Sequence, residues 1–330
     1  MIDIFYLCKL IIVAFTISVF SSFLIYRFGL RIGLIDIPSN RGSHSIAVPR
    51  GGGIGILLSF MIIDIYINKD YYLVFYIFAI SIFSFVDDHY DIKAKYKFIV
   101  HLLISCIVGV YLFGNPMSLL EIMFLVSVTI FLSGTANFYN FMDGINGLAG
   151  LSGIISFGLL AIFSFRYNLN IQLGISSIIV AVACFGFLIY NFPKAKIFMG
   201  DVGSIFLGFV FGLFVIMLSS SLKIFMCLIL FLSTFYADAI VSLYYRWRRG
   251  DNLLRAHRMH LYQYLTNENS IPHWKVSLIY TFFQLFIGLL SIVAYDHGLI
   301  FQILLFVVYG ILFVIVYSRI KSNTLEVIKN

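Results

Sequence analysis

Residues 118–137 read SLLEIMFLVSVTIFLSGTAN, a run of twenty residues in which only Glu121 carries a charge. An α-helix needs about 20 mostly apolar residues to cross the hydrocarbon core of a bilayer. Helix is also required there, because lipid offers an open backbone no hydrogen-bond partners. The run therefore predicts a membrane-spanning helix, and the polar stretch NFYNFMDGINGLAG at 137–150 predicts the loop that follows it.

The same pattern recurs along all 330 residues, of which 61% are hydrophobic and 11% charged. Soluble domains carry about 25% charged residues, so this composition indicates a protein that lives in lipid. We predict an all-α, polytopic integral membrane protein that forms a single membrane-embedded domain over residues 1–330. About eleven transmembrane helices are expected, at 4–26, 51–67, 71–86, 98–114, 118–137, 145–165, 171–191, 203–221, 223–245, 275–295 and 299–318.

The positive charges predict how these spans are oriented. If the N-terminus lies outside, 18 of the 22 Lys and Arg residues fall in inner loops, in the C-terminal tail or at their borders. Lys and Arg gather in the cytoplasmic loops of membrane proteins. We therefore predict a periplasmic N-terminus and a cytoplasmic C-terminus. The outer loops are short, so all loops with chemical content fall on the predicted cytoplasmic face.

Carboxylates crowd the second inner loop. The span at 71–86 runs into FSFVDDHYD (83–91), which places Asp87 and Asp88 at a helix C-terminus. Carboxylates there face the negative end of the helix dipole, and adjacent ones repel unless a cation or proton relieves them. Mg²⁺ takes oxygen ligands and usually bridges to substrate phosphates. We predict a metal-dependent phosphate site, with hydrated helix-end residues as the alternative. The lysines at 93–97 suit an anionic partner or lipid headgroups equally well.

Polar side chains also border the third and fourth inner loops. Asn137, Asn140 and Asp143 recur every three residues, roughly along one helical face, and Asp201 directly precedes the eighth span. Amide and carboxylate oxygens are suitable ligands for a metal ion, and amides also donate hydrogen bonds to a base. The alternatives are polar residues that hold helices together, and an Asp201 that merely caps the next helix.

The first and fifth inner loops carry basic and polar candidates for substrate binding. Two histidines three residues apart favour phosphate or diphosphate binding over a plain positive-inside anchor, which needs no histidine. A zinc site is less favoured, because no cysteine or third histidine lies at a suitable spacing. The candidates are Asn40, Arg41 and His44 in the first loop, and Arg255, His257, Arg258 and His260 in the fifth.

Two acidic residues lie inside predicted spans, where an ionisable side chain usually indicates function. Asp238 precedes the fifth inner loop by about two helical turns and is expected to face the interior of the bundle. Asp64 lies near an outer helix end, and its side chain is expected to reach the interface.

Taken together, six motifs in order resemble the polyprenyl-phosphate N-acetylhexosamine-1-phosphate transferase superfamily. The resemblance covers nearly the whole chain, and it implies an eleven-span enzyme of the bacterial inner membrane whose active site faces the cytoplasm. One departure is Asn146, where many bacterial members have aspartate. The motifs are DxPxxRxxH at 36–44, PRGGG at 49–53, DDxxD at 87–91, NxxNxxDGxNGL at 137–148, GDxGS at 200–204 and HRxHxYQ at 257–263.

The resemblance also implies a role for each motif. Asn140 and Asp201 are expected to ligate Mg²⁺, with Mn²⁺ as an alternative. Asp87 and Asp88 are expected to handle the polyprenyl phosphate and, with Asp201, to be catalytic. Two groups are expected around the donor: Asp143 and Asn146 at the nucleotide, and His257, Arg258 and His260 at the diphosphate or sugar phosphate.

The expected reaction transfers N-acetylhexosamine-1-phosphate from a UDP-sugar to undecaprenyl phosphate and releases UMP. The HRMHLYQ form is similar to the subgroup that begins O-antigen units. Membrane lipid is an expected partner and nucleic acid is not, and related enzymes suggest a homodimer. The rival class is a polytopic secondary transporter of an anionic substrate. Transporters concentrate polar groups near the bilayer midplane in repeated halves, whereas here they crowd one predicted face.

Overall fold

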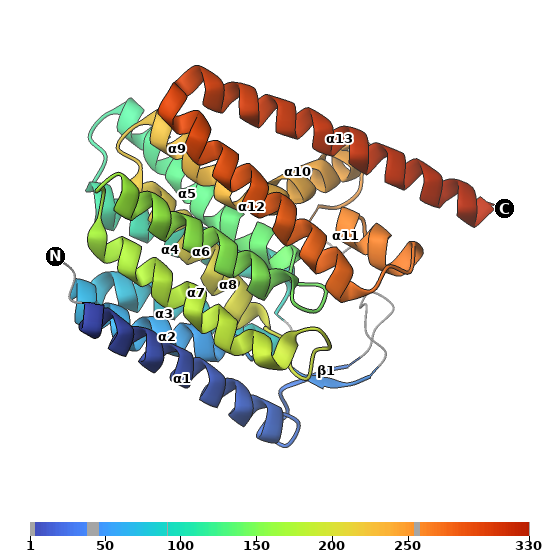
Figure 1. Ribbon diagram of the computed structural model, residues 1–330, viewed down its shortest axis with the longest axis horizontal. Coiled ribbons are helices and arrows are strands. Elements are labelled where there is room, and N and C mark those ends of the chain that lie inside the picture. Colours follow the sequence, from blue (N-terminus) through green and yellow to red (C-terminus); the bar gives the residue numbers. More distant parts are fainter. Residues whose placement is uncertain (1–3, 38–45, 91, 254–257, 330) are drawn as a thin grey trace.

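The computed structural model describes residues 4–37, 46–90, 92–253 and 258–329, with side chains as far as Ser322. The axes of the long helices lie roughly side by side, and the two chain ends lie at opposite ends of the bundle (Figure 1). The elements are α1 (Ile4–Phe28), β1 (Ile35–Asp36), β2 (Val48–Pro49), α2 (Ile54–Asn68), α3 (Tyr71–Tyr90), α4 (Ala94–Phe113), α5 (Leu119–Phe141), α6 (Leu148–Arg166), α7 (Ile171–Asn191), α8 (Asp201–Leu218), α9 (Leu222–Ile229), η1 (Leu230–Leu232), α10 (Ser233–Arg248), α11 (Leu261–Gln263), η2 (Tyr264–Glu268), α12 (His273–His297) and α13 (Leu299–Lys329).

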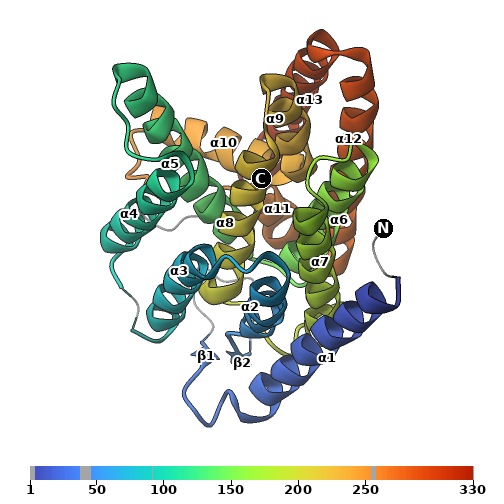
Figure 2. The same cartoon turned by 90° about the vertical axis from the view of Figure 1, so that its left-hand side faces the viewer.

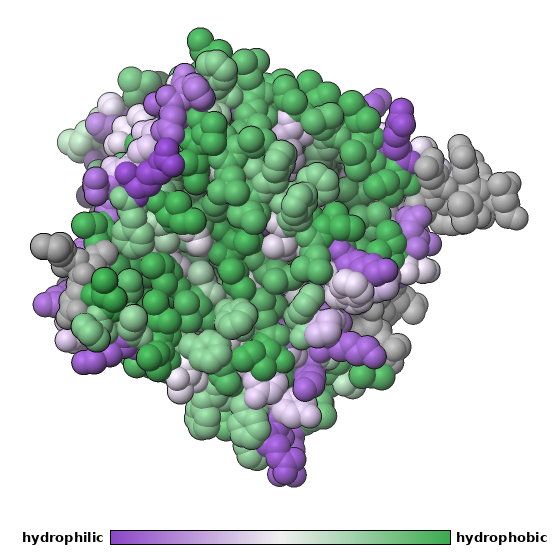
Figure 3. All heavy atoms as spheres, in the orientation of Figure 1, coloured by the Kyte–Doolittle hydropathy of each residue, from purple (hydrophilic) through white to green (hydrophobic). Residues whose placement is uncertain are grey.

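The predicted class is confirmed. Among the described residues, ten helical segments are long and apolar enough to cross a bilayer, with α9, η1 and α10 counted as one. Each of the eleven predicted spans coincides with one of these segments or with α2, which is apolar but has 15 residues. On the face shown in Figure 3, hydrophobic side chains cover the middle and hydrophilic ones gather toward the ends. The number of crossings and the orientation of the termini stay predictions.

Helix α8 lies in the middle of the bundle, where it contacts α2, α3, α5, α6 and α9 (Figure 2). Small residues let its neighbours approach closely, as is common where helices pack in membranes. A Cβ on Gly208 would lie 2.7 Å from Cα of Ala136, so glycine is needed for the contact with α5. Because α8 is enclosed on several sides, its first residue, Asp201, has a well-defined place among the surrounding helix ends.

The predicted inner loops lie toward the end of the bundle at which β1 and α11 are found (Figure 1). Direct hydrogen bonds join them, so the predicted gathering of these loops on one side is confirmed. The bonds run from Gly52 N to Phe198 O (2.9 Å), from Val202 N to Asp88 Oδ2 (3.3 Å), from Gly147 N to Asn191 Oδ1 (2.7 Å) and from Tyr262 Oη to Phe141 O (3.0 Å).

The expectation that Asp64 reaches the interface is wrong. Its side chain is 5% exposed and accepts hydrogen bonds from Ser176 Oγ and from Asn68 Nδ2, each at 2.5 Å. Ser176 belongs to α7, so the carboxylate links α2 to a neighbouring helix. Such pairing replaces the water that a carboxylate otherwise needs.

Candidate active site

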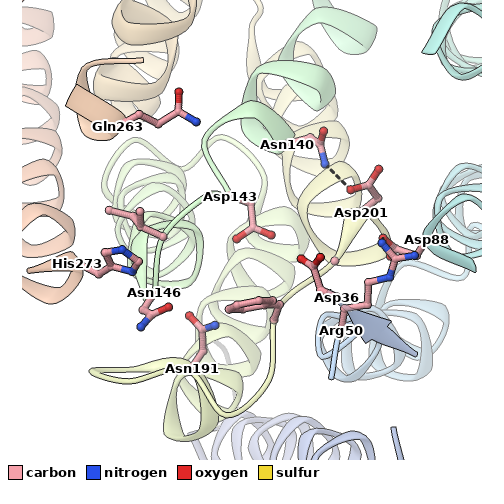
Figure 4. Close-up of a pocket in the computed structure, with 14 residues that line it drawn as sticks. Asp36, Arg50, Asp88, Asn140, Asp143, Asn146, Asn191, Asp201, Gln263 and His273 are labelled. Carbon is pink, nitrogen blue, oxygen red and sulfur yellow. Dashed lines mark hydrogen bonds and ion pairs between the residues drawn. The ribbon is translucent and has the colours of Figure 1, made fainter. Parts of the chain in front are cut away.

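A polar cavity of about 250 Å³ opens where the inner loops meet (Figure 4). Its polar lining comes from the five predicted inner loops and their borders, which lie far apart in sequence. The polar lining residues are Asp36, Arg50, Asp88, Asn140, Asp143, Asn146, Asn191, Asp201, Gln263 and His273.

Asp201 is held beside the cavity because it is the first residue of α8. The N-cap is Gly200, which has φ of 77°, so the alternative that Asp201 merely caps the helix is wrong. Its Oδ1 accepts a hydrogen bond of 2.9 Å from Asn140 Nδ2 (Figure 4). The same amide nitrogen donates to Ser204 Oγ at 2.9 Å. Any metal ligand supplied by Asn140 is therefore its amide oxygen.

Asp87 and Asp88 lie in the last turn of α3, as predicted, and both are buried. Asp88 accepts from Val202 N in the first turn of α8, and its Oδ1 lies 3.8 Å from Arg50 Nη1. Asp87 accepts from Ile92 N at 2.8 Å, which closes the turn after α3. The two carboxylates therefore face different partners, and both point toward the start of α8.

Lys97 joins two of the acidic residues. Its ammonium forms an ion pair with Asp87 and lies 3.5 Å from Asp201 Oδ2. Opposite charges that share a partly buried site relieve the repulsion that adjacent carboxylates would otherwise suffer. From the sequence, Lys97 is only one of the lysines at 93–97 that suit an anionic partner or lipid headgroups. Only the packing of α4 against α3 and the ion pair with Asp201 distinguish it from Lys95, which is exposed.

Asp143 lies in the turn after α5, next to the cavity. Removal from water raises the pKa of its carboxyl group well above the usual value of 3.8, and nearby Asp201, Asp88 and Asp36 raise it further. The turn brings Asn146 to the same cavity, where its Nδ2 lies 3.5 Å from Pro193 O. Asp143, Asn146 and Asp201 thus line the same cavity, whereas their roles in binding stay predictions.

The raised pKa predicts a stability effect. A carboxyl group whose pKa is raised by folding stabilises the protein below its unfolded pKa, and this contribution is lost as pH rises through the folded pKa. Replacing Asp143 by asparagine should therefore raise the melting temperature of the substrate-free protein at pH 7.5, on the order of 2–4 °C. The gain should disappear near pH 4. Thermal unfolding in detergent measures this, with the exposed Asp251→Asn as control; no gain at pH 7.5 would contradict the assignment.

Asp87, Asp88, Asp143 and Asp201 form an acidic cluster, which fits a magnesium ion that substrates help to bind. Within the described residues, no three His, Cys, Asp or Glu side chains lie close enough to hold a metal by themselves. Mg²⁺ usually takes one or two carboxylates, with substrate phosphates and water as its other ligands. Asp201 and the amide oxygen of Asn140 can supply such ligands. Within the described residues, the carboxylates at or beside the cavity are Asp36, Asp87, Asp88, Asp143 and Asp201. Ion pairs join three of them to the cations Lys97 and Arg50.

The fifth inner loop is only partly described. Arg255 and His257 lie outside the described residues, and Arg258 is exposed. His260 is 2% exposed and lies at the start of α11, where its Nδ1 is 3.3 Å from Asp238 Oδ1. It is absent from the cavity lining given above. Direct binding of the diphosphate by His260 therefore stays a prediction, while Gln263, three residues later, does line the cavity.

The first inner loop brings two residues of its motifs to the cavity. These are Asp36 and Arg50, at and just after the β1–β2 pair, whose register sets Asp36 opposite Val48. Asn40, Arg41 and His44 lie outside the described residues, so their predicted roles stay predictions. Arg50 Nε is buried, and no described residue accepts a hydrogen bond from it. A buried donor of this kind is ready for an anionic ligand.

Other cavity residues carry weak sequence signals. Asn191 ends α7 and accepts from Gly147 N, and His273 begins α12. Both lie at predicted span borders, which is the only signal that could have indicated them. The backbone of Phe198 donates a hydrogen bond to Pro49 O and accepts one from Gly52 N. Its aromatic side chain lines the polar cavity.

Part of the chain is similar to known proteins. Residues 71–219 match Glycosyl transferase family 4. A probable undecaprenyl-phosphate N-acetylglucosaminyl 1-phosphate transferase of Bacillus subtilis is 30% identical over 219 residues, which cover 60% of each chain. A phospho-N-acetylmuramoyl-pentapeptide-transferase of Staphylococcus carnosus is 29% identical over 206 residues, 53% of this chain and 64% of the relative. The match thus spans less than two thirds of the length of these relatives.

The matched region contains α3, α4, α5 and α8. It therefore includes the acidic cluster, Asp87, Asp88, Asp143 and Asp201, together with Asn140 and Lys97. Over this region, the chain is similar to glycosyl transferase family 4 and to transferases of the polyprenyl-phosphate N-acetylhexosamine-1-phosphate superfamily.

Proposed function

We propose that this protein transfers N-acetylhexosamine-1-phosphate from a UDP-sugar to undecaprenyl phosphate and releases UMP. The observation that carries the proposal is the convergence of Asp88, Asn140 and Asp201 on a polar cavity at the end of a membrane bundle, with Asp87 joined to Asp201 through Lys97. The names of the two relatives describe transfer of sugar phosphates of this kind. A water-soluble donor and a membrane-anchored acceptor can meet only at such a boundary.

The donor fits the part of the cavity away from α3. Asp143, Asn146 and Asn191 offer hydrogen-bonding groups there, and Phe198 offers an aromatic face on which a planar base can stack. Arg50, with its buried Nε, suits the diphosphate because a guanidinium binds phosphate oxygens well. Arg258 and His260 remain candidates for the sugar phosphate.

The acceptor tail fits a second cavity, of about 730 Å³, among α5, α9, η1, α10 and α13. Its lining is almost wholly apolar, as a polyprenyl chain requires. On α5, Phe138 faces this apolar cavity while Asn140, two residues later, faces the polar one. A lipid held in the apolar cavity can therefore bring its phosphate to the acidic cluster.

The chemistry joins two anions, so their charges have to be neutralised first. A lipid phosphate oxygen forms a bond to the phosphorus that carries the sugar, and the bond from that phosphorus to the UMP oxygen breaks. Lys97 and Arg50 offset the negative charge, and Asp87 orients the lipid phosphate. Asp201 and Asn140 would hold Mg²⁺ or Mn²⁺, which stabilises charge on the transferring phosphoryl oxygens when bound.

The remaining features follow from this proposal. The active site would face the cytoplasm, where UDP-sugars are made, and the protein would lie in the bacterial inner membrane, as the distribution of Lys and Arg favours. The product would start a cell-envelope polysaccharide. O-antigen is proposed for that polysaccharide on the HRMHLYQ segment alone.

A panel of UDP-sugars with undecaprenyl phosphate, followed by mass spectrometry of UMP, tests the proposal and identifies the sugar. UMP release that needs both substrates is the expected result. Uptake of an anionic solute into proteoliposomes without UMP release would favour the transporter instead. Asp87 and Asp88 lie in the last turn of α3 rather than at its middle, which favours the enzyme.

Filling the apolar cavity should weaken binding of the lipid. Gly134 lines this cavity, and a Cβ added there meets nothing within 4 Å. Gly134→Leu should therefore raise the KM for undecaprenyl phosphate about tenfold, because several methylene contacts are lost. The KM for a short-chain polyprenyl phosphate should change less. Steady-state kinetics with both acceptors measure the difference.

Gly158→Leu is the matched control, since Gly158 on α6 has equal space for a Cβ and does not line the cavity. Equal effects of the two substitutions on the long-chain acceptor would remove the apolar cavity from the proposal.

A further inference from the structure

A buried carboxylate outside the cavity, Asp238, accepts hydrogen bonds from four donors. It lies within α10 and is 0% exposed. An unsatisfied charge within a membrane span is expensive, and such residues usually serve function. The donors around its two oxygens are Tyr280 Oη (2.7 Å), Leu261 N (2.9 Å), His260 Nδ1 (3.3 Å) and Tyr262 N (3.4 Å).

Three of these four donors belong to one short segment, residues 260–262. Two of them are backbone N–H groups at the start of α11, so the carboxylate fixes the backbone there and not only a side chain. Ser242, one turn further along α10, lies 3.1 Å from the same His260 Nδ1. Segment 260–263 is therefore attached to α10 at several points.

The same segment forms one wall of the polar cavity. Gln263 lines the cavity from α11 (Figure 4), and its Oε1 accepts from His260 N at 3.2 Å. Tyr262 Oη donates to Phe141 O at the end of α5, and its ring fills the space where Gly144 would carry a Cβ. The turn that holds Asp143 thus rests on Tyr262.

We propose that Asp238 is a positioning residue for the donor substrate. It holds residues 260–263 against the turn at 142–147, so that Gln263 and Asp143 face the donor from fixed places. The inference rests on the proposed function, which it deepens. Asp238 acts on the donor rather than the lipid because its hydrogen bonds run to the polar wall, whereas its neighbours Ala237 and Ile240 line the apolar cavity.

The test compares two buried acids at different places in the bundle. Asp238→Asn keeps the size of the side chain but removes one acceptor oxygen. Asp64→Asn makes the same change in a carboxylate that is also buried and hydrogen-bonded, between α2 and α7. Tyr280→Phe removes a single donor to Asp238 and is the milder variant if Asp238→Asn folds poorly.

Two measurements on the protein in detergent test the inference. Hydrogen–deuterium exchange at residues 260–266 should accelerate about tenfold in Asp238→Asn, less in Tyr280→Phe and not at all in Asp64→Asn, since a hydrogen bond to a charged group is weakened. The KM for the UDP-sugar should rise about tenfold in Asp238→Asn, with the KM for undecaprenyl phosphate unchanged.

Unchanged exchange at 260–266, or a loss of kcat with no change in the donor KM, would overturn the inference. An equal rise in donor KM in Asp64→Asn would also overturn it, because the effect would then reflect general stability. If the unsubstituted protein releases no UMP from any UDP-sugar, the proposed function fails. The exchange experiment still decides whether Asp238 holds the segment in place.

Discussion

Replacement of Asp201 by asparagine is expected to lower UMP release by at least about a thousandfold. Among the described residues, Asp201 is the carboxylate that contacts both Asn140 and Lys97. It is partly exposed, beside the buried Asp87 and Asp88. Loss of its charge removes the proposed metal ligand at the point where phosphoryl charge develops. Several kcal/mol of transition-state stabilisation correspond to a loss of this size.

The measurement is single-turnover UMP release at saturating UDP-sugar and lipid, with Mn²⁺ binding followed by electron paramagnetic resonance. Asp296→Asn is the control, because Asp296 lies in the last turn of α12, in an exposed ion pair with Arg166. Metal binding and turnover equal to those of the unsubstituted protein would exclude Asp201 as a metal ligand. A folded but inactive variant that has lost Mn²⁺ binding is the expected result.

Lys97→Met is expected to reduce turnover by about a hundredfold or more. The ammonium separates Asp87 from Asp201, so its removal leaves two neighbouring carboxylates without their shared cation. Asp87 would then take up a proton or turn away, and it could no longer orient the lipid phosphate. An interaction of a few kcal/mol with a buried charge corresponds to this loss in rate.

Lys95→Met provides a close control, since it removes the same charge from the same turn at an exposed position. Higher Mg²⁺ concentrations should restore part of the Lys97→Met activity, because a divalent ion can also neutralise the pair. If Lys95→Met and Lys97→Met lose activity equally, the lysines act only as a positive surface for lipid headgroups. The ion pair would then have no separate role.

Most of the fold could be predicted from sequence because membrane helices depend on local composition. The spans follow from runs of apolar residues, and α2 shows the limit of this argument, since its 15 residues are too few to settle whether it crosses. The gathering of Asp88 and Asp201 at one end also follows, because each lies next to the end of a span on the same predicted side. Their contact through Val202 agrees with that expectation.

The partners of each site residue could not be predicted in this way. Lys97 and Lys95 look alike in sequence, and Asp64 and Asp238 are both acids within apolar runs. Which lysine bridges two carboxylates, and which acid holds the wall of the cavity, depends on contacts between segments more than 20 residues apart in sequence, such as that of Asp238 with His260. No local pattern encodes such a distance.

The sequence alone thus determined which segments enter the membrane, which loops lie together and which residue types are available for chemistry. Lipid imposes these properties on each segment separately, through hydrophobicity and charge. The tertiary structure alone decided that Arg50, Lys97 and Gln263 join the acidic residues, and that His260 turns toward Asp238 instead of lining the cavity. These choices arise from how closely the helices pack around α8, because ion pairs and hydrogen bonds form only within a few ångströms.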